Sequence, residues 1–295
     1  MKRVYATTSV WLLVLAALVF FTGCDEEVVA VTGTDRAYSL YGVFSPQLDT
    51  QWVRVFPIEG SLRLAGDSPL AATVTSDVGG RPDGRVWTDS VMIETSGQFA
   101  HVFWAPFSAE YERTYTLRVS GDDGRMSRAT ATVPPETEMI LPARTNQPAS
   151  VFSVRVQGAA PNLIRIEITY SVRYLGFGGI EIERFTVGYD DEAVQTSGGW
   201  DIPVSAGLDV GGRMRALAAE GLRRDVAEFK VSRIDVRLIV ANAEWKPPGG
   251  SFDADVLVQP GLMSNVTNGF GFLGAGYRHQ ASWIPLDTLI VSGGG

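Results

Sequence analysis

Apolar and polar side chains alternate with a period of two along much of residues 37–135. Within residues 113–120, Tyr115, Leu117 and Val119 occupy one side of such a pattern, and polar residues occupy the other. This period is typical of a strand with one buried face. The pattern predicts seven short strands, at residues 37–44, 51–58, 70–76, 86–94, 99–104, 113–120 and 125–133.

Turn-forming residues separate these strands, among them Gly79, Gly80 and the segments 82–84 and 122–124. Seven short strands at regular spacing are typical of an immunoglobulin-like β-sandwich, which we expect over residues 37–135. Two consecutive prolines end this unit.

After a connector at residues 136–149, we expect a second β-rich domain, residues 150–295, with one helix at 213–229. Gly221 lowers the stability of that helix by ~1 kcal/mol. The strongest strand turns through four residues, three of them glycine, into a hairpin. One face of this strand carries Ile164, Ile166, Ile168, Tyr170, Val172 and Tyr174. Further strands are expected at residues 151–156, 180–187, 231–244 and 283–291. The predicted fold class is mainly β.

The N-terminus is typical of a bacterial lipoprotein signal peptide, residues 1–23. Lys2 and Arg3 precede an apolar run of about a dozen residues, whereas a span of the bilayer core needs ~20. Small residues then lead to Cys24, the only cysteine of the chain. We therefore expect lipid attachment at Cys24. The alternatives are a retained transmembrane anchor and a cysteine that merely follows the cleavage site.

Residues 24–36 are expected to form a tether, which begins with the acidic run Asp25, Glu26 and Glu27. An acidic residue after the lipidated cysteine resembles an inner-membrane retention signal in enteric bacteria. In the Bacteroidota a short acidic run at this place resembles a signal for export to the cell surface. A solvated start of the linker is the third interpretation.

Composition is that of a folded protein, with 45% hydrophobic and 20% charged residues. The leader carries two of the 25 basic residues, so 23 basic and 33 acidic residues remain after it, a formal charge of −10. This acidity argues against nucleic acid or an anionic lipid surface as the main partner. An acylated Cys24 leaves no cysteine for an internal disulfide.

Three segments carry a resemblance to a known family: residues 38–44, 114–125 and 264–274, the last reading Ser-Asn-Val-Thr-Asn-Gly-Phe-Gly-Phe-Leu-Gly. Together with Cys24, they resemble the uncharacterised Bacteroidota lipoproteins catalogued as domain of unknown function 4249. The resemblance covers nearly all of the chain after the leader, although residues 175–230 match only in the order of elements. It implies a place at the outer membrane or cell surface, as an accessory to a TonB-dependent receptor. It supplies no ligand and no catalytic residue.

The spacing Gly269-x-Gly271-x-x-Gly274 fits a dinucleotide-binding fingerprint as text. That loop requires a strand before it, a helix after it and an acidic residue ~20 positions on. Here only about 20 residues follow, and they are expected to form strand. We therefore interpret the glycines as structural and expect no cofactor.

Metal-binding and catalytic patterns are weak in this chain. His101 is expected on the solvent side of its strand, and His279 has no cysteine or carboxylate at ligand spacing for zinc. The acidic segment 190–192 suits an exposed loop, with a calcium site as the alternative. No nucleophile–base pair follows from spacing. Several tryptophans lie near strand ends and serve either the core or a sugar-binding face: Trp87, Trp104, Trp200 and Trp245.

These observations favour a non-enzymatic binding or accessory module, exported and lipid-anchored to the cell envelope, with the ligand unidentified. A structural or adhesive surface lipoprotein without a small ligand is the first alternative. An extracellular hydrolase is the second, and it would need paired carboxylates in a deep cleft.

Overall fold

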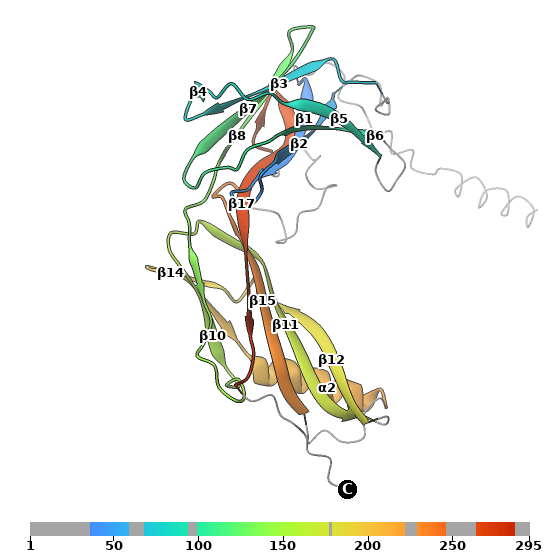
Figure 1. Cartoon of the computed structure of the whole chain (residues 1–295), viewed down its shortest axis with the longest axis vertical. Coiled ribbons are helices and arrows are strands. Elements are labelled where there is room, and N and C mark those ends of the chain that lie inside the picture. Colours follow the sequence, from blue (N-terminus) through green and yellow to red (C-terminus); the bar gives the residue numbers. More distant parts are fainter. Residues whose placement is uncertain are drawn as a thin grey trace, which may run out of the picture. The chain divides into compact units, whose positions relative to one another are not determined.

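The protein is mainly β in its computed structural model, which describes residues 36–58, 68–93, 99–176, 179–221, 229–245 and 264–286 (Figure 1). The leader, Cys24 and most of the tether lie outside the described residues. The described part contains three sheets, in which nearly all pairings are antiparallel, and one helix, α2 (Ala206–Ala219). The mainly β class predicted from the sequence is confirmed.

The largest sheet has eight strands, and the other two have five and four. In spatial order, the eight are β12 (Gly179–Gly188), β11 (Asn162–Gly176), β15 (Phe229–Ala241), β17 (Gly269–Trp283), β1 (Tyr38–Phe44), β2 (Gln51–Pro57), β6 (Phe99–Ala105) and β5 (Thr88–Ile93). The five are β16 (Val266–Thr267), β8 (Met126–Thr132), β7 (Thr114–Gly121), β3 (Ala72–Val78) and β4 (Arg81–Pro82). The four are β13 (Val194–Thr196), β14 (Gly199–Val204), β10 (Phe152–Gln157) and β9 (Glu138–Ile140).

Strand β17 has two different partners along its length (Figure 1). Its first half runs parallel to β1, from Gly269 opposite Tyr38 to Ala275 opposite Phe44. Its second half runs antiparallel to β15 and ends with Trp283. The short strand β16, just before it, pairs with β8. Late residues of the chain therefore complete sheets that early residues begin.

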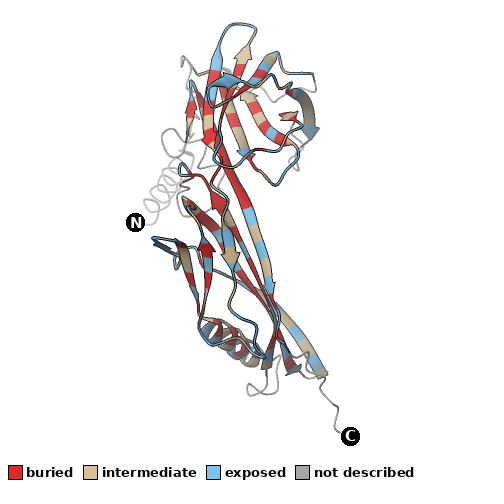
Figure 2. Ribbon diagram, turned by 60° about the vertical axis from the view of Figure 1, so that its left-hand side comes forward, coloured by how far each residue is buried: buried red, intermediate tan, exposed pale blue. Residues whose placement is uncertain are grey.

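One hydrophobic core is built by strands of the eight-stranded and the five-stranded sheets together. Strands β1, β2 and β6 contribute from the first, and strands β3, β7 and β8 contribute from the second. Phe44 and Tyr115 are fully buried there, with ring centroids 5.2 Å apart. Burying one such side chain contributes roughly 1.5–3 kcal/mol. Figure 2 shows the resulting alternation of buried and exposed positions along these strands.

A second core lies between the β11–β15 part of the large sheet, the four-stranded sheet and α2. The helix contributes Val210, Met214 and Leu217, which follow one another at helical spacing. The strands contribute chiefly β-branched residues, such as Ile168 and Val236. On the opposite side of this part of the sheet, some described residues are exposed, among them Glu167 and Arg173.

The seven strands predicted for the first half are confirmed to within two residues at each end. The predicted connector is not free of regular structure, because it contains β9. Strands β13 and β14 escaped prediction since they are short and flank a glycine-rich turn. The strand expected at 283–291 is wrong for residues 284–286, which follow the end of β17, and residues 287–291 lie outside the described residues.

The predicted helix at 213–229 agrees with the structure over residues 213–219 only, because α2 begins at Ala206 and ends at Ala219, and residues 222–228 lie outside the described residues. Its start was hidden by three glycines in the first two turns, which interrupt the apolar pattern. Its end is set by Gly221, whose φ of +73° is unfavourable for other residues and whose N–H bonds to the carbonyl of Ala218. Gly221 thus terminates the helix and does not weaken its interior.

The strongest predicted strand, β11, contains a bulge that the alternation did not reveal. Arg165 has a φ of +51°, and the register shifts between Ile164 and Glu167. The extra residue turns Ile164 away from the face that carries Ile166 and Ile168. Ile164 instead joins a small cluster with Phe272, so the prediction of a single apolar face is wrong at that position.

Candidate functional site

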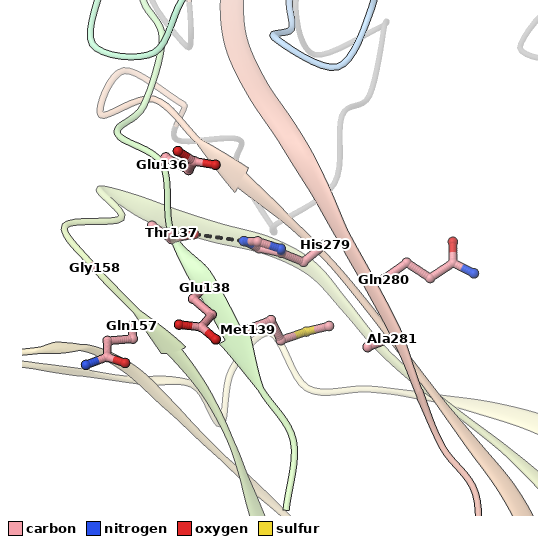
Figure 3. Close-up of a pocket in the computed structure, with 9 residues that line it drawn as sticks. All are labelled: Glu136, Thr137, Glu138, Met139, Gln157, Gly158, His279, Gln280 and Ala281. Carbon is pink, nitrogen blue, oxygen red and sulfur yellow. Dashed lines mark hydrogen bonds between the residues drawn. The ribbon is translucent and has the colours of Figure 1, made fainter.

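An open groove of about 570 Å³ lies where the start of β9 faces the second half of β17 (Figure 3). Six of its nine lining residues carry polar side chains. The groove is lined by Glu136, Thr137, Glu138, Met139, Gln157, Gly158, His279, Gln280 and Ala281. Among the residues described, these place several hydrogen-bonding side chains within one concave surface.

A chain of hydrogen bonds fixes His279 within this groove. The Oη–H of Tyr277 donates to the carbonyl of Pro135 at 2.6 Å. Thr137 Oγ1 lies 2.9 Å from Tyr277 Oη and 2.8 Å from His279 Nε2. Because the Tyr277 proton is engaged with Pro135, the Thr137 hydroxyl donates to Tyr277 and accepts from His279 Nε2–H. Nδ1 of His279 is thereby left as a hydrogen-bond acceptor.

Electrostatics favour the neutral form of this histidine. Burial lowers the pKa of His279 below its ordinary value, because a charged imidazolium loses hydration there. Burial also raises the pKa of Tyr277, so its phenol stays protonated and continues to donate. The rings of Tyr277 and Tyr111 also pack edge to face, with centroids 5.2 Å apart, which restrains Tyr277. His279 therefore presents a fixed, neutral acceptor at neutral pH.

The remaining walls add both donors and acceptors. Glu138 and Gln157 are register partners on β9 and β10, and both are exposed. Figure 3 shows the Thr137 and His279 side chains pointing toward one another, whereas the Gln280 side chain extends away from them. The groove thus suits a ligand that carries hydroxyl or amide groups.

Gly158, just after β10, lets this part of the chain approach Thr137, just before β9, closely. Its φ is +120°, and a Cβ atom there would lie 3.0 Å from the side chain of Thr137. The N–H of Gly158 bonds to Gly198 O, which fixes the turn after β10. A larger residue would strain the backbone and push Thr137 away from His279.

The glycine-rich segment expected to be structural does form strand. Gly269 and Gly271 lie against the carbonyl oxygens of Tyr38 and Leu40 on β1. The chain continues past Gly274 as β17, where a dinucleotide loop would require a helix. The strand prediction for these residues is confirmed.

The prediction that His101 faces solvent is wrong. His101 is buried, and its Nδ1 lies 3.1 Å from Asp89 on the neighbouring strand β5. In β6, Phe103 and Ala105 face the first core together with His101, whereas Ala100 and Trp104 point to the other side.

In the acidic segment 190–192, Asp190 is exposed, and its carboxylate accepts a hydrogen bond from the backbone N–H of Ile166. This bond gives Asp190 a structural role. No three metal-binding side chains cluster among the residues that the structure describes.

The tryptophans mostly serve the core. Trp87 and Trp245 are buried, and the indole N–H of Trp200 bonds to the carbonyl of Ala160. The exception is a cross-strand pair, Trp52 and Trp104, whose ring centroids are 6.0 Å apart. Trp52, which was not among the tryptophans expected there, is 44% exposed, so of the expected set only Trp104, beside Trp52, supports the idea of a sugar-binding face.

Comparisons with known proteins do not show to which family the chain belongs. No protein-family model matches it, and no curated protein matches it. Among solved structures, it is similar to dimeric latent PorU from Porphyromonas gingivalis, with 14% identity and a TM-score of 0.21. That likeness covers 86% of this chain but only 21% of the PorU chain. A likeness of this TM-score establishes neither fold nor function.

No described helix combines the length and apolar character that a membrane span requires. Cys24, the one predicted site residue, lies outside the described residues, so lipid attachment there stays a prediction. The groove itself was not foreseen. Thr137 was assigned to a connector, and His279 lies 142 residues further on, so no local pattern joins them.

Proposed function

We propose that the protein is a non-enzymatic binding module of the cell envelope that uses the groove beside His279. The observation that carries this proposal is the bond from His279 to Thr137, which holds a neutral imidazole in an open polar groove. Such a preorganised acceptor binds ligand donors without having to be reoriented.

The bound group would be a hydroxyl- or amide-bearing segment. His279 Nδ1 would accept a hydrogen bond from it, and the exposed Gln157 amide would both donate and accept. Two carboxylates, Glu136 and Glu138, disfavour an anionic ligand at this place.

The envelope location rests on the sequence. Cys24 after a signal peptide would carry the acyl chains that hold the protein to a membrane. The resemblance to Bacteroidota lipoproteins favours the outer membrane or cell surface, with a TonB-dependent receptor as the partner that the module assists.

The finer fold assignment is also a proposal. Residues 37–135 would form an immunoglobulin-like sandwich, since two sheets share the core around Phe44 and Tyr115. An experimental structure would then show these sheets face to face at ~10 Å. Sheets that meet edge to edge would contradict the assignment.

Co-purification tests the function. The tagged full chain, expressed in its native host, would be isolated in mild detergent as wild type and as Thr137→Val. The substitution keeps the side-chain shape and removes the hydroxyl that holds His279, so the captured ligand or partner should be lost. Thr73→Val, at an exposed position of β3, is the matched control and should retain it. Equal capture by both variants would reject the groove as the site.

A further inference from the structure

The hairpin of β11 and β12 exposes one face near its turn. On β12, Glu183 accepts hydrogen bonds from Arg213 of α2, so the Glu183 side of the strand is the side that the helix covers. Successive side chains of a strand point to opposite faces. Ile182 and Arg184 therefore lie on the uncovered face, at the edge of the eight-stranded sheet.

Three aliphatic side chains are exposed together at the end of this hairpin. Leu175 and Ile180 are direct register partners, and Ile182 follows two residues later on the same face. They are 50%, 58% and 63% exposed, respectively. Exposed aliphatic side chains that lie together in one patch are a mark of interaction sites, unlike apolar residues that are scattered singly.

Basic residues share the row of Ile182 and also occupy the row behind it on the same face. Arg173 is the register partner of Ile182 on one side and of Lys230 on the other. One row further, Ser171 has Arg184 and Arg233 as its two partners. The face thus changes from aliphatic to cationic within two to three residues of the hairpin end.

The cationic rows are only partly neutralised. Arg184 and Arg233 pair with Asp235, at 3.6 and 2.6 Å. Burial by itself would raise the pKa of Asp235. Hydrogen bonds from Ser282 and Arg233 outweigh burial, so the pKa is lowered overall. Arg173 and Lys230 form no ion pair with any described residue, although like charges directly opposite one another destabilise a sheet. This arrangement fits an anionic partner.

We propose that this hairpin end binds the surface of an anionic lipid bilayer. Two residues along a strand advance ~6.6 Å, so the row of Arg173, Ile182 and Lys230 would lie at phosphate level when the end row of Leu175 and Ile180 enters the headgroup boundary. Interfacial segments enter that boundary by ~5–10 Å. In a protein interface, a polar rim surrounds the apolar centre; here the aliphatic residues stand at the extremity with the charges behind them.

The net negative charge of the protein argues against an anionic surface as its main partner, but salt screens that charge at the distance of this local contact. At physiological salt, exposed charges act over ~8 Å, so acidic residues far from the hairpin are screened. Closer by, on the covered face of β12, Glu183 pairs with Arg213 and Glu181 accepts a hydrogen bond from Tyr174. On the uncovered face, Glu167 lies three rows back from Arg173, directly opposite Arg237. The contact is independent of the groove, and neither proposal requires the other.

Vesicle flotation tests the proposal. The chain of residues 25–295 keeps every described residue and lacks the leader and any acyl chain. It should float with phosphatidylcholine vesicles that contain phosphatidylglycerol, and should not float with phosphatidylcholine alone or in molar salt. Arg173→Gln with Lys230→Gln should weaken binding about tenfold or more. Ile180→Ser with Ile182→Ser should also weaken it.

Arg81→Gln with Val86→Ser is the matched control, because both side chains are exposed and lie far along the sequence from the hairpin. It should bind as the wild type does, and circular dichroism melting should show all variants folded. Failure of the wild type to float, or equal flotation of all folded variants, would overturn the proposal. Failure to float combined with hairpin-dependent capture of an acidic protein would assign the face to that protein and also overturn it.

Discussion

Gly271 packs its Cα against the carbonyl oxygen of Leu40, in the parallel pairing that joins β17 to β1. A Cβ atom at this position would overlap that oxygen. The φ of Gly271 is +97°, a conformation that L-residues rarely adopt. Both the close contact and the positive φ require glycine at this position. They explain why Gly271, one glycine of the spacing that fits a dinucleotide fingerprint, is present without a cofactor role.

Replacing this glycine should destabilise the protein. We expect Gly271→Val to lower the free energy of unfolding by ~1–3 kcal/mol, measured by urea titration. Gly124→Val is the control, since Gly124 has a φ of +79° and open space around it. Gly124→Val therefore measures the cost of the backbone strain alone, ~1–2 kcal/mol, without any steric overlap. Tight nucleotide binding by the wild type, lost in Gly271→Val at unchanged stability, would restore the cofactor interpretation.

The anchor is tested at Cys24. Cys24→Ser removes the only sulfur that can be acylated and should release the protein from the membrane or block its processing. Detergent-phase partition measures the effect. Thr22→Ser keeps the cysteine and should partition as the wild type does. If Cys24→Ser still enters the detergent phase unchanged, another element holds the protein.

The independence of the first half is tested by two fragments. Residues 37–135 alone should give a β-type circular dichroism spectrum and a cooperative melt. Joining residues 264–276 after residue 135 should raise the melting temperature, because β16 and the start of β17 add Val266 and Leu273 to the same core. A disordered short fragment that folds only in the longer form would show that both halves of the sequence share one core.

Acid should weaken the fold through His279. Its pKa is lowered by burial from 6.5, so the unfolded chain binds more protons than the folded chain between the lowered pKa and 6.5. The free energy of unfolding therefore rises with pH across that window and falls on acidification below about 6.5. His279→Gln, which can still donate to Thr137, should show a smaller change of the free energy of unfolding with pH below about 6.5, measured by urea titration at several pH values. An identical change with pH would mean that His279 titrates normally.

Local pattern sufficed for most strands of the first half. In β7, Tyr115, Leu117 and Val119 alternate with polar residues because one face meets the core, and this signal lies within eight residues. The start of the helix was not predicted because glycines occupy its first turns and only packing against the sheet compensates for them. Tertiary context overrides propensity there.

Long-range pairings could not be predicted from local pattern. The two partners of β17 come from opposite ends of the described chain, and nothing in the alternation distinguishes a parallel from an antiparallel neighbour. The groove has the same origin. Thr137 and His279 carry no mutual spacing signal, and the neutral acceptor arises only when burial and the Tyr277 bond are both present.

Position-resolved photo-crosslinking tests the groove most directly. A photoreactive residue at Gln157, an exposed groove wall, would be compared in native membranes with one at Asp191, an exposed loop position outside it. The binding-module account predicts one discrete adduct at Gln157, reduced in the Thr137→Val background and missing at Asp191. The same adducts at both positions, or none at Gln157, would contradict the account.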